Sequence, residues 1–568
     1  MLNATTAVGT TAIGSSSMGD GTLTGDFNTA VGYLSGIDMT SGIENTLVGS
    51  NAGENLTIGN YNTVLGFKAL EKSVDGDYNT AVGYKALEDY EDGDGNGHNT
   101  AVGASSQLNA STGEYNTSLG SLSMGNGLET GNYNTALGYQ SGRDLTSGTE
   151  NTFIGGHSGM LVSTGTHNVA VGMQTMQNTT VGTHNTALGT YAMFTNVDSS
   201  KNVAVGYNSL RMLEPASAVD SLNVAVGFEA GKAMTTGVNN TIVGAQAGDA
   251  LTTGDRNVAV GHFALSAETT GYRNVAVGAE ALLSLNAGAN YNTALGDSAG
   301  EALTTGSNNV FVGGLSGDQL LTGSQNVAVG YAALGSANGS EGRNVAVGYN
   351  ALLAQDGDGN AYNTAVGYQA GNAITTGTNN TLIGGLAGDA LTTGSDNVVL
   401  GYAALSSANA GNRSVAIGSS ALNAQNAGSA GQNMYNVGIG YNAGGSITTG
   451  VQNTIIGGLA GDAITGADNN VALGYNSLSA TTVGSTSIGI GYYALQAQNN
   501  AANNYNIGIG HSAGAAISTG IQNTLIGGLA GDALTTGSYN QAFGYNALGA
   551  ETGASRSTAI GYFALAVQ

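Results

Sequence analysis

Two acidic loops carry the residue types that most resemble a cation site. In each loop two aspartates and an asparagine alternate with glycine, and such oxygen ligands are typical of calcium-binding loops. The twelfth position of the first loop is Gly103 in place of the glutamate of an EF-hand, which excludes that motif. Hydrated acidic turns are the favoured interpretation and calcium loops the alternative; no other cofactor is expected. The candidate ligands are Asp92, Asp94 and Asn96 in the first loop and Asp356, Asp358 and Asn360 in the second.

Aromatic residues form the second group of candidate binding residues. The 26 tyrosines fall mainly just before a recurring asparagine or just after a recurring glycine. Exposed rings could stack on the sugars of a host polysaccharide, but a half-buried tyrosine ladder is the favoured interpretation. His167 and His184 precede successive copies of that asparagine, and without nearby carboxylates they are expected to form a surface ladder and not a metal site.

No pattern of catalytic residues emerges from the sequence, and we expect no enzymatic activity. Gly-x-Gly strings lie inside a repeat and not between a strand and a helix, so they do not indicate a nucleotide site. With 12 basic and 37 acidic residues, the net charge of −25 argues against nucleic acid and anionic lipid as partners. The chain has no cysteine, no long apolar run and no secretory signal at its start, so membrane insertion is not expected.

A single repeat positions all of these residues. Its core is Asn-(Thr/Val)-x-(Val/Leu/Ile)-Gly, and its usual step is about 17 residues, a length typical of solenoid coils. From residue 28 onward, 31 units follow one another. The glycine is present in every unit, whereas the leading asparagine is replaced by Ser414, Ser487 and Ser557. Representative ladder positions are Asn28, Asn79, Asn134, Asn223, Asn292, Asn363, Asn436 and Asn506, with Gly83, Gly278, Gly367 and Gly440.

This period predicts an all-β fold, an elongated parallel β-solenoid (β-roll) with about 17 residues per coil. Five residues of alternating size suit one short strand in each coil. We expect Thr364 and Val366 to point into the coil, and Ala365 and Gly367 to lie on the opposite face, where another backbone approaches. Asparagines in register can bond through their amides along the stack.

The repeat divides into three regions with inserted loops. Residues 1–27 are predicted as irregular N-terminal coils, 28–222 as divergent solenoid repeats, and 223–568 as repeats in four-coil blocks of roughly 70 residues. Six basic residues before the lead position are expected to pair with acidic neighbours: Lys201, Arg256, Arg273, Arg343, Arg413 and Arg556. Partner contacts are expected at the inserted loops 88–97, 210–221, 351–361 and 426–434, because loops on a rigid scaffold vary freely.

Four segments carry a resemblance to known families: NTAVGYKAL (79–87), NVAVGYNAL (344–352), RSVAIGSSAL (413–422) and RSTAIGYFAL (556–565). They resemble the head repeats of trimeric autotransporter adhesins, and still more the Asn-Thr-Ala-Val-Gly-Tyr repeats of bacteriophage tail-fibre-like proteins. The resemblance covers nearly the whole chain. It implies a homotrimer of parallel β-rolls, intertwined or side by side, that serves as a fibre shaft or receptor-binding element.

The sequence therefore predicts a structural fibre protein, virion-associated or extracellular, with multivalent attachment to a host surface. Its expected partners are itself, other fibre or virion proteins at uncapped ends, and a host glycan or protein. A self-polymerising extracellular filament and a cell-surface adhesin are the alternatives. An ice-binding or mineral-binding threonine face is disfavoured, because threonine alternates irregularly with valine at the same position.

Overall fold

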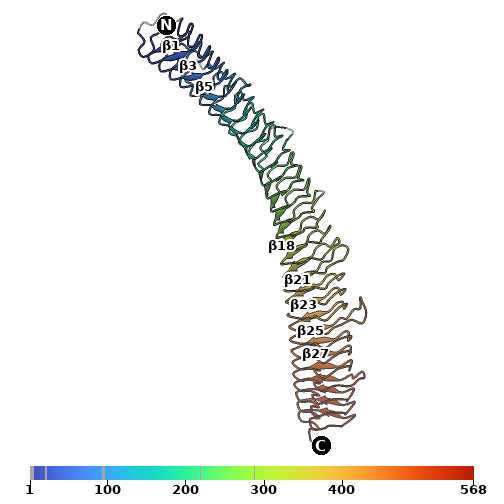
Figure 1. Cartoon of the computed structure of the whole chain (residues 1–568). Coiled ribbons are helices and arrows are strands. Elements are labelled where there is room, and N and C mark those ends of the chain that lie inside the picture. The colour runs from blue at the N-terminus through green and yellow to red at the C-terminus, as the bar shows by residue number, and fades with distance from the viewer. Residues whose placement is uncertain are drawn as a thin grey trace. The chain divides into compact units, whose positions relative to one another are not determined.

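The computed structural model describes residues 6–19, 22–91, 96–215, 217, 219–286 and 288–567. These residues form a parallel β-solenoid in which each turn contributes one short strand, a tight turn and a return segment (Figure 1). Most turns repeat at the predicted sequence spacing, so the all-β class and the predicted coil length are confirmed. In this described part of the chain, no helix is long and apolar enough to cross a membrane.

Two compact units divide the chain, and their boundary falls within the predicted region 223–568. Unit 1 comprises Met1–Glu280 and Asn286–Ala289, and unit 2 comprises Ala281–Leu285 and Asn290–Gln568. The strands of unit 1 are β1 (Thr11–Ile13), β2 (Thr29–Val31), β3 (Thr46–Val48), β4 (Thr63–Leu65), β5 (Thr80–Val82), β6 (Thr100–Val102), β7 (Thr117–Leu119), β8 (Thr135–Leu137), β9 (Thr152–Ile154), β10 (Val169–Val171), β11 (Thr186–Leu188), β12 (Val203–Val205), β13 (Val224–Val226), β14 (Thr241–Val243), β15 (Val258–Val260) and β16 (Val275–Val277). The strands of unit 2 are β17 (Thr293–Leu295), β18 (Val310–Val312), β19 (Val327–Val329), β20 (Val345–Val347), β21 (Thr364–Val366), β22 (Thr381–Ile383), β23 (Val398–Leu400), β24 (Val415–Ile417), β25 (Val437–Ile439), β26 (Thr454–Ile456), β27 (Val471–Leu473), β28 (Ile488–Ile490), β29 (Ile507–Ile509), β30 (Thr524–Ile526), β31 (Gln541–Phe543) and β32 (Thr558–Ile560).

Strands pair in parallel with the same position of the next turn. Thr46 pairs with Thr63, one period along the chain. The register survives the inserted loops: Thr80 pairs with Thr100, and Val415 pairs with Val437. Longer turns therefore send their extra residues away from the sheet, because a slip of one residue would turn every side chain to the other face.

A ladder of buried asparagine amides connects successive turns. The Oδ1 atom of Asn28 accepts hydrogen bonds from the backbone N–H of Asn45 at 2.9 Å and from its Nδ2 at 3.0 Å. The Nδ2 of Asn45 also donates to the carbonyl of Gly59 in the following turn at 2.8 Å. Such an amide satisfies polar groups of three turns, which offsets the cost of burying it; only the Nδ2 groups of Asn79 and Asn344 lack a partner among the described ladder asparagines. The ladder residues named from the sequence are all fully buried: Asn28, Asn79, Asn134, Asn223, Asn292, Asn363, Asn436 and Asn506.

Buried glutamines continue the amide ladder in two of the turns where serine replaces the asparagine. The Oε1 of Gln425 lies 3.2 Å from the hydroxyl of Ser414 and accepts from the Nδ2 of Asn436 at 2.9 Å. Gln498 relays Ser487 to the next asparagine in the same way, through bonds of 2.8 and 2.9 Å. Gln355 accepts from the Nδ2 of Asn363 at 2.8 Å in the same way, although asparagine leads its turn, so the glutamine accompanies the longer turns and not only the serines.

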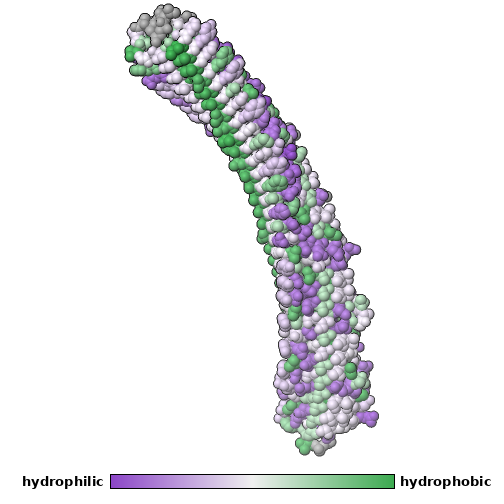
Figure 2. Space-filling model, in the orientation of Figure 1, coloured by the Kyte–Doolittle hydropathy of each residue, from purple (hydrophilic) through white to green (hydrophobic). Residues whose placement is uncertain are grey.

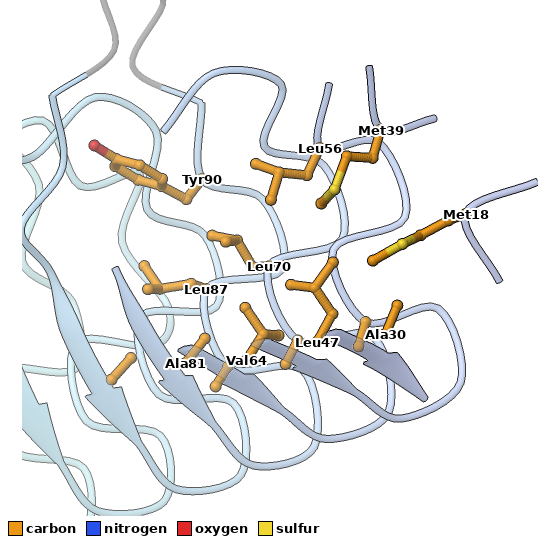
Figure 3. Close-up of a cluster of buried hydrophobic side chains, with 14 of the residues drawn as sticks. Met18, Ala30, Met39, Leu47, Leu56, Val64, Leu70, Ala81, Leu87 and Tyr90 are labelled. Atoms are coloured by element: carbon orange, nitrogen blue, oxygen red, sulfur yellow. The ribbon is translucent and has the colours of Figure 1, made fainter. Parts of the chain in front are cut away.

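The predicted facing of the strand residues is wrong. The central residue Ala365 is fully buried, whereas Thr364 and Val366 are half-buried on the outer face of the sheet. Figure 3 shows the same arrangement near the N-terminus, where the central strand residues point into the interior towards the opposite wall of the coil. The interior takes small strand residues because leucines from that wall already fill it, and the β-branched residues pack well on the outer surface.

Core volume is shared between each strand and the opposite wall. Where the central strand residue is alanine, the facing position eight residues after the lead asparagine is commonly leucine or methionine, such as Leu87 opposite Ala81. Where the central residue is large, that position is glycine in its own turn and in the preceding turn. Phe153 is the example: a Cβ added at Gly142 or Gly159 would meet its ring at 2.9 or 2.5 Å. A large side chain on the strand thus faces glycine on the opposite wall, and a small one commonly faces leucine or methionine, so the core stays filled in every turn.

The glycine that ends each strand is required by close approach of the backbone. Gly367 has a φ of 144°, and a Cβ placed on it would lie 2.4 Å from the carbonyl oxygen of Gly384 in the next turn. Gly83 and Gly440 have the same conformation and the same contact with the next turn. Gly278 also has a positive φ, 138°, and its carbonyl oxygen lies 2.3 Å from the Cβ position of Gly261. The close approach predicted for this position is present, although it is made along the stack.

The exchange of core volume can be tested by moving side-chain volume from the strand to the opposite wall. Phe153→Ala should destabilise the protein by about 3–5 kcal/mol, the cost of emptying a buried aromatic site. Adding Gly142→Leu and Gly159→Leu should recover most of that loss in a urea titration, because leucine occupies these positive-φ positions in other turns. The two leucine substitutions without Phe153→Ala serve as the control and should destabilise through overpacking. A triple variant no more stable than Phe153→Ala would contradict the exchange.

Candidate functional site

The outward residues of the strands form the most extensive candidate interaction surface. We call this surface the strand face: the first and third residues of each strand β1–β32. In these positions the strands carry threonine, valine, isoleucine and leucine, with Gln541 and Phe543 as exceptions, and none carries a charge. In Figure 2 a green band follows the strands of unit 1 from β1 onward. In a chain with 37 acidic residues, these outward strand positions are therefore free of charge in each unit.

Exposure of the strand face exceeds what a covered core surface would show. Leu65 and Leu119 in unit 1 are each 50% exposed, and Leu295 in unit 2 is 48% exposed. Large contiguous apolar surfaces of this kind mark interaction sites in soluble proteins. The third residue of nearly every strand is aliphatic and the first is threonine or an aliphatic residue, so the face offers apolar surface and hydroxyls but no titratable group.

Aromatic rings stack in a column just before the ladder asparagines of unit 1. Tyr61, Tyr78, His98, Tyr115 and Tyr133 follow one another with centroid distances between 4.7 and 5.0 Å and nearly parallel rings. Each of these residues has a positive φ, which points its side chain outward from the turn. The rings are partly exposed and cover one another, as the ladder interpretation predicts.

A second aromatic column follows the turn glycines, and we call it the post-glycine column. In unit 2, Tyr331, Tyr349 and Tyr368 stack at 5.6 and 5.5 Å. Tyr475, Tyr492 and His511 form another run, at 5.5 and 5.4 Å. The column is interrupted at intervals by residues without a ring, so its rings differ in how much of each face is covered.

The second acidic loop lines a small cavity, but its acidic groups do not converge. Asp358 and Asn360 border a cavity of about 120 Å³, together with Gln355 and the threonines of the next turn. Asp356 does not border it, and the amide oxygen of Asn360 lies over Gly342 in the preceding turn.

The first acidic loop is only partly described. Asp92 and Asp94 lie outside the described residues, and the backbone carbonyl of Asn96 accepts from the Tyr90 hydroxyl at 3.1 Å. Within the described ranges, no three His, Asp or Glu side chains gather as a metal group would require. Calcium binding stays a prediction for both loops.

The predicted histidine pair is present, with one correction. His167 and His184 stack at 4.6 Å, one turn apart. A carboxylate does lie nearby, contrary to the expectation from the sequence: Glu150 Oε2 is 3.0 Å from Nε2 of His167. Glutamate in the preceding turn occupies the same column position, so the stack itself brings the two together.

The basic residues before the lead position divide between acidic and aromatic neighbours. Lys201 pairs with Asp220 at 2.6 Å and Arg413 with Asp396 at 3.5 Å, in adjacent turns as predicted. Arg556 and Arg343 instead lie over tyrosine rings, with Arg556 5.6 Å from the ring of Tyr539. At exposed sites such pairs contribute little stability each.

Three fully buried glutamates were missed by the sequence analysis. Glu268 occupies a position where other turns carry leucine, and its Oε1 accepts from the backbone N–H groups of Thr269, Thr270 and Gly271 at 2.7–2.9 Å. Glu341 receives one such bond, from Gly339 at 3.2 Å. Both oxygens of Glu129 are buried without a hydrogen-bond partner, and burial raises the pKa of its carboxyl to about 8. The burial of Glu268 could have been predicted from the sequence, because it stands at a repeat position where other turns carry leucine.

Comparison with known proteins adds no relative to this picture. No family model matches the chain, and no curated protein matches it.

Glu129 should make stability depend on pH. Its folded-state pKa lies above its unfolded value of about 4.5, so folding binds a proton and stability falls as pH rises from about 4.5 through about 8. The shift corresponds to at most about 5 kcal/mol at that turn. Glu129→Gln, which cannot ionise, should raise the melting temperature at pH 8.5 and change it little at pH 4.5. A variant whose melting temperature parallels that of the parent at both pH values would exclude this role.

Proposed function

We propose that the protein is a structural fibre protein, a viral or phage tail-fibre-like shaft that attaches multivalently to a host surface. The strand face is the observation that carries this proposal. It repeats along both units, it combines a row of aliphatic third residues with a mixed row of threonine and aliphatic first residues, and it lacks the charges that the rest of the chain carries in excess. We infer a binding and mechanical role for the protein and not a catalytic one.

A second copy of the same chain is the partner that best fits the strand face. Rows of side chains repeat along each unit at about 4.8 Å, and a partner with the same repeat matches them turn by turn. The net charge of −25 opposes contact between other faces of two copies, so the uncharged face is where they can approach. The number of copies, three, follows from the resemblance of the repeats to trimeric adhesin heads and tail-fibre-like proteins.

The proposed setting is the virion or the extracellular space. There the ends of the assembly meet other fibre proteins, and repeated weak contacts to a host surface combine into avidity. In a self-polymerising filament the ends would stack head to tail, and indefinite length would separate it from the fibre. A cell-surface adhesin would be revealed by a signal or anchor in the full gene or its neighbours.

Native mass and two strand-face variants test the proposal together. The protein should sediment as a particle of three chains, each of 56.1 kDa. Leu295→Lys combined with Leu400→Lys places two charges on the strand face and should shift most of the protein to the monomer, since burying unpaired charges is costly.

The matched control is Asn379→Lys combined with Gln452→Lys, which adds the same charge in the column where Lys201 stands in unit 1. It should leave the particle mass unchanged. A monomeric parent protein, or a strand-face variant that keeps the parent's mass while folded by circular dichroism, would refute the proposed assembly. Filaments of indefinite length would select the self-polymerising alternative.

A further inference from the structure

The post-glycine column of unit 2 is interrupted by glycine once in every four-turn block. In turns with the sequence Gly-Gly-Leu, the second glycine stands where the next turn carries a tyrosine. The preceding turn carries Tyr368, Tyr441 or His511 in three cases and Asp297 in the fourth. We call each such interruption a ring gap. The four ring gaps are at Gly314, Gly385, Gly458 and Gly528.

Each ring gap leaves a tyrosine face uncovered. A Cβ added at Gly385 would lie 3.6 Å from Cδ2 of Tyr402, so the ring of the next turn lies directly over the glycine. The same contact occurs at Gly458, 3.6 Å from the ring of Tyr475, and any side chain there would fill the space under the ring. The backbone does not require glycine at either position, because neither has a positive φ and other turns carry tyrosine, alanine or serine.

Rings that border a ring gap are all exposed, but to different extents. Tyr402 and Tyr441, which each adjoin a ring gap on one side and Ser419 on the other, are 63% exposed, whereas Tyr475, with a ring gap on one side and a stacked ring on the other, is 45% exposed. Where the column is complete, neighbouring rings are about 5.5 Å apart. Across Gly385, Tyr368 and Tyr402 are two turns apart, roughly 9.6 Å along the stack, which is the space of one ring.

The chemistry of a ring gap fits a neutral ring with an apolar face. Three of the four gaps have an aromatic residue on both sides and glycine backbone as the floor, whereas the gap at Gly314 has Tyr331 on one side and Asp297 on the other. Binding therefore relies mainly on stacking on the tyrosine face. The excess of acidic residues in the chain disfavours anionic sugars. A neutral pyranose has a C–H face for the ring and peripheral hydroxyls that remain in water.

We propose that the ring gaps at Gly314, Gly385, Gly458 and Gly528 are repeated binding sites that each stack one neutral pyranose ring of an oligosaccharide or polysaccharide. Successive sites are four turns apart, roughly 19 Å along unit 2. Each site binds weakly, and a long glycan that engages several of them gains affinity through effective concentration. The inference stands independently of the fibre role, because it depends only on unit 2.

Saturation-transfer NMR with two neutral hexasaccharides, cellohexaose and maltohexaose, tests the sites. Irradiating the tyrosine ring protons of the full chain should saturate the sugar C–H protons of at least one probe. Gly385→Tyr, Gly458→Tyr and Gly528→Tyr together fill three of the four ring gaps and should reduce the signal at least threefold. Melting temperature should be unchanged or higher, since these rings extend existing stacks.

The matched control adds three tyrosines to the same three turns, at Asn379, Gln452 and Gln522, and leaves the ring gaps open. These positions have the positive φ that Tyr362 and Tyr539 adopt natively. The control should keep the full signal. Absence of saturation transfer to both probes, or equal signal from the filled and open variants, would overturn the proposal; a signal lost in both triple variants would assign binding to another surface and overturn it as well.

Discussion

The buried asparagine amide is the interaction on which the structure depends. Each turn is too small to bury a core alone, and backbone hydrogen bonds to the next turn, such as the N–H of Gly36 to the carbonyl of Ala52 at 3.0 Å, form only when the turns stack in register. The amide of one asparagine binds the backbone and side chain of the next, and also a carbonyl one turn further on. In most of the described turns the donors and the acceptor of the amide are satisfied, with the Nδ2 of Asn79 and of Asn344 as exceptions before longer turns, so the ladder fixes register as well as stability.

In-register stacking then determines the surfaces. Once residues one period apart are neighbours, any residue type that recurs in the repeat becomes a row: an uncharged strand face, aromatic columns, and glycines that let the backbones approach. Differences between turns become features at fixed intervals, as at Gly385 and Gly458. What each surface can bind therefore depends on whether its row of side chains is continuous or interrupted.

Sequence reasoning reached the period, the fold class and the asparagine ladder because all three depend on spacing. It misplaced Ala365 and its neighbours because alternation separates two faces without saying which is inside, and the volume of the opposite wall decides that. The amide relay through Gln425 and the buried carboxyl of Glu129 could not be found from residue spacing. Each depends on which buried polar groups a longer or altered turn leaves without a hydrogen-bond partner. The acidic loops matched a motif, and the described residues do not gather three carboxylates there.

Hydrogen exchange in an Asn309→Ala variant tests the central claim most directly. In the parent protein the backbone N–H of Asn326 donates to Oδ1 of Asn309 at 2.9 Å, and the Nδ2 of Asn309 donates to the carbonyl of Gly323 at 2.9 Å. Removing the amide leaves these buried groups without partners, at about 1–3 kcal/mol each. The account predicts at least tenfold faster exchange at Asn326 and its turn, with turns farther along unit 2 unchanged. Equal protection in the variant and the parent would contradict it.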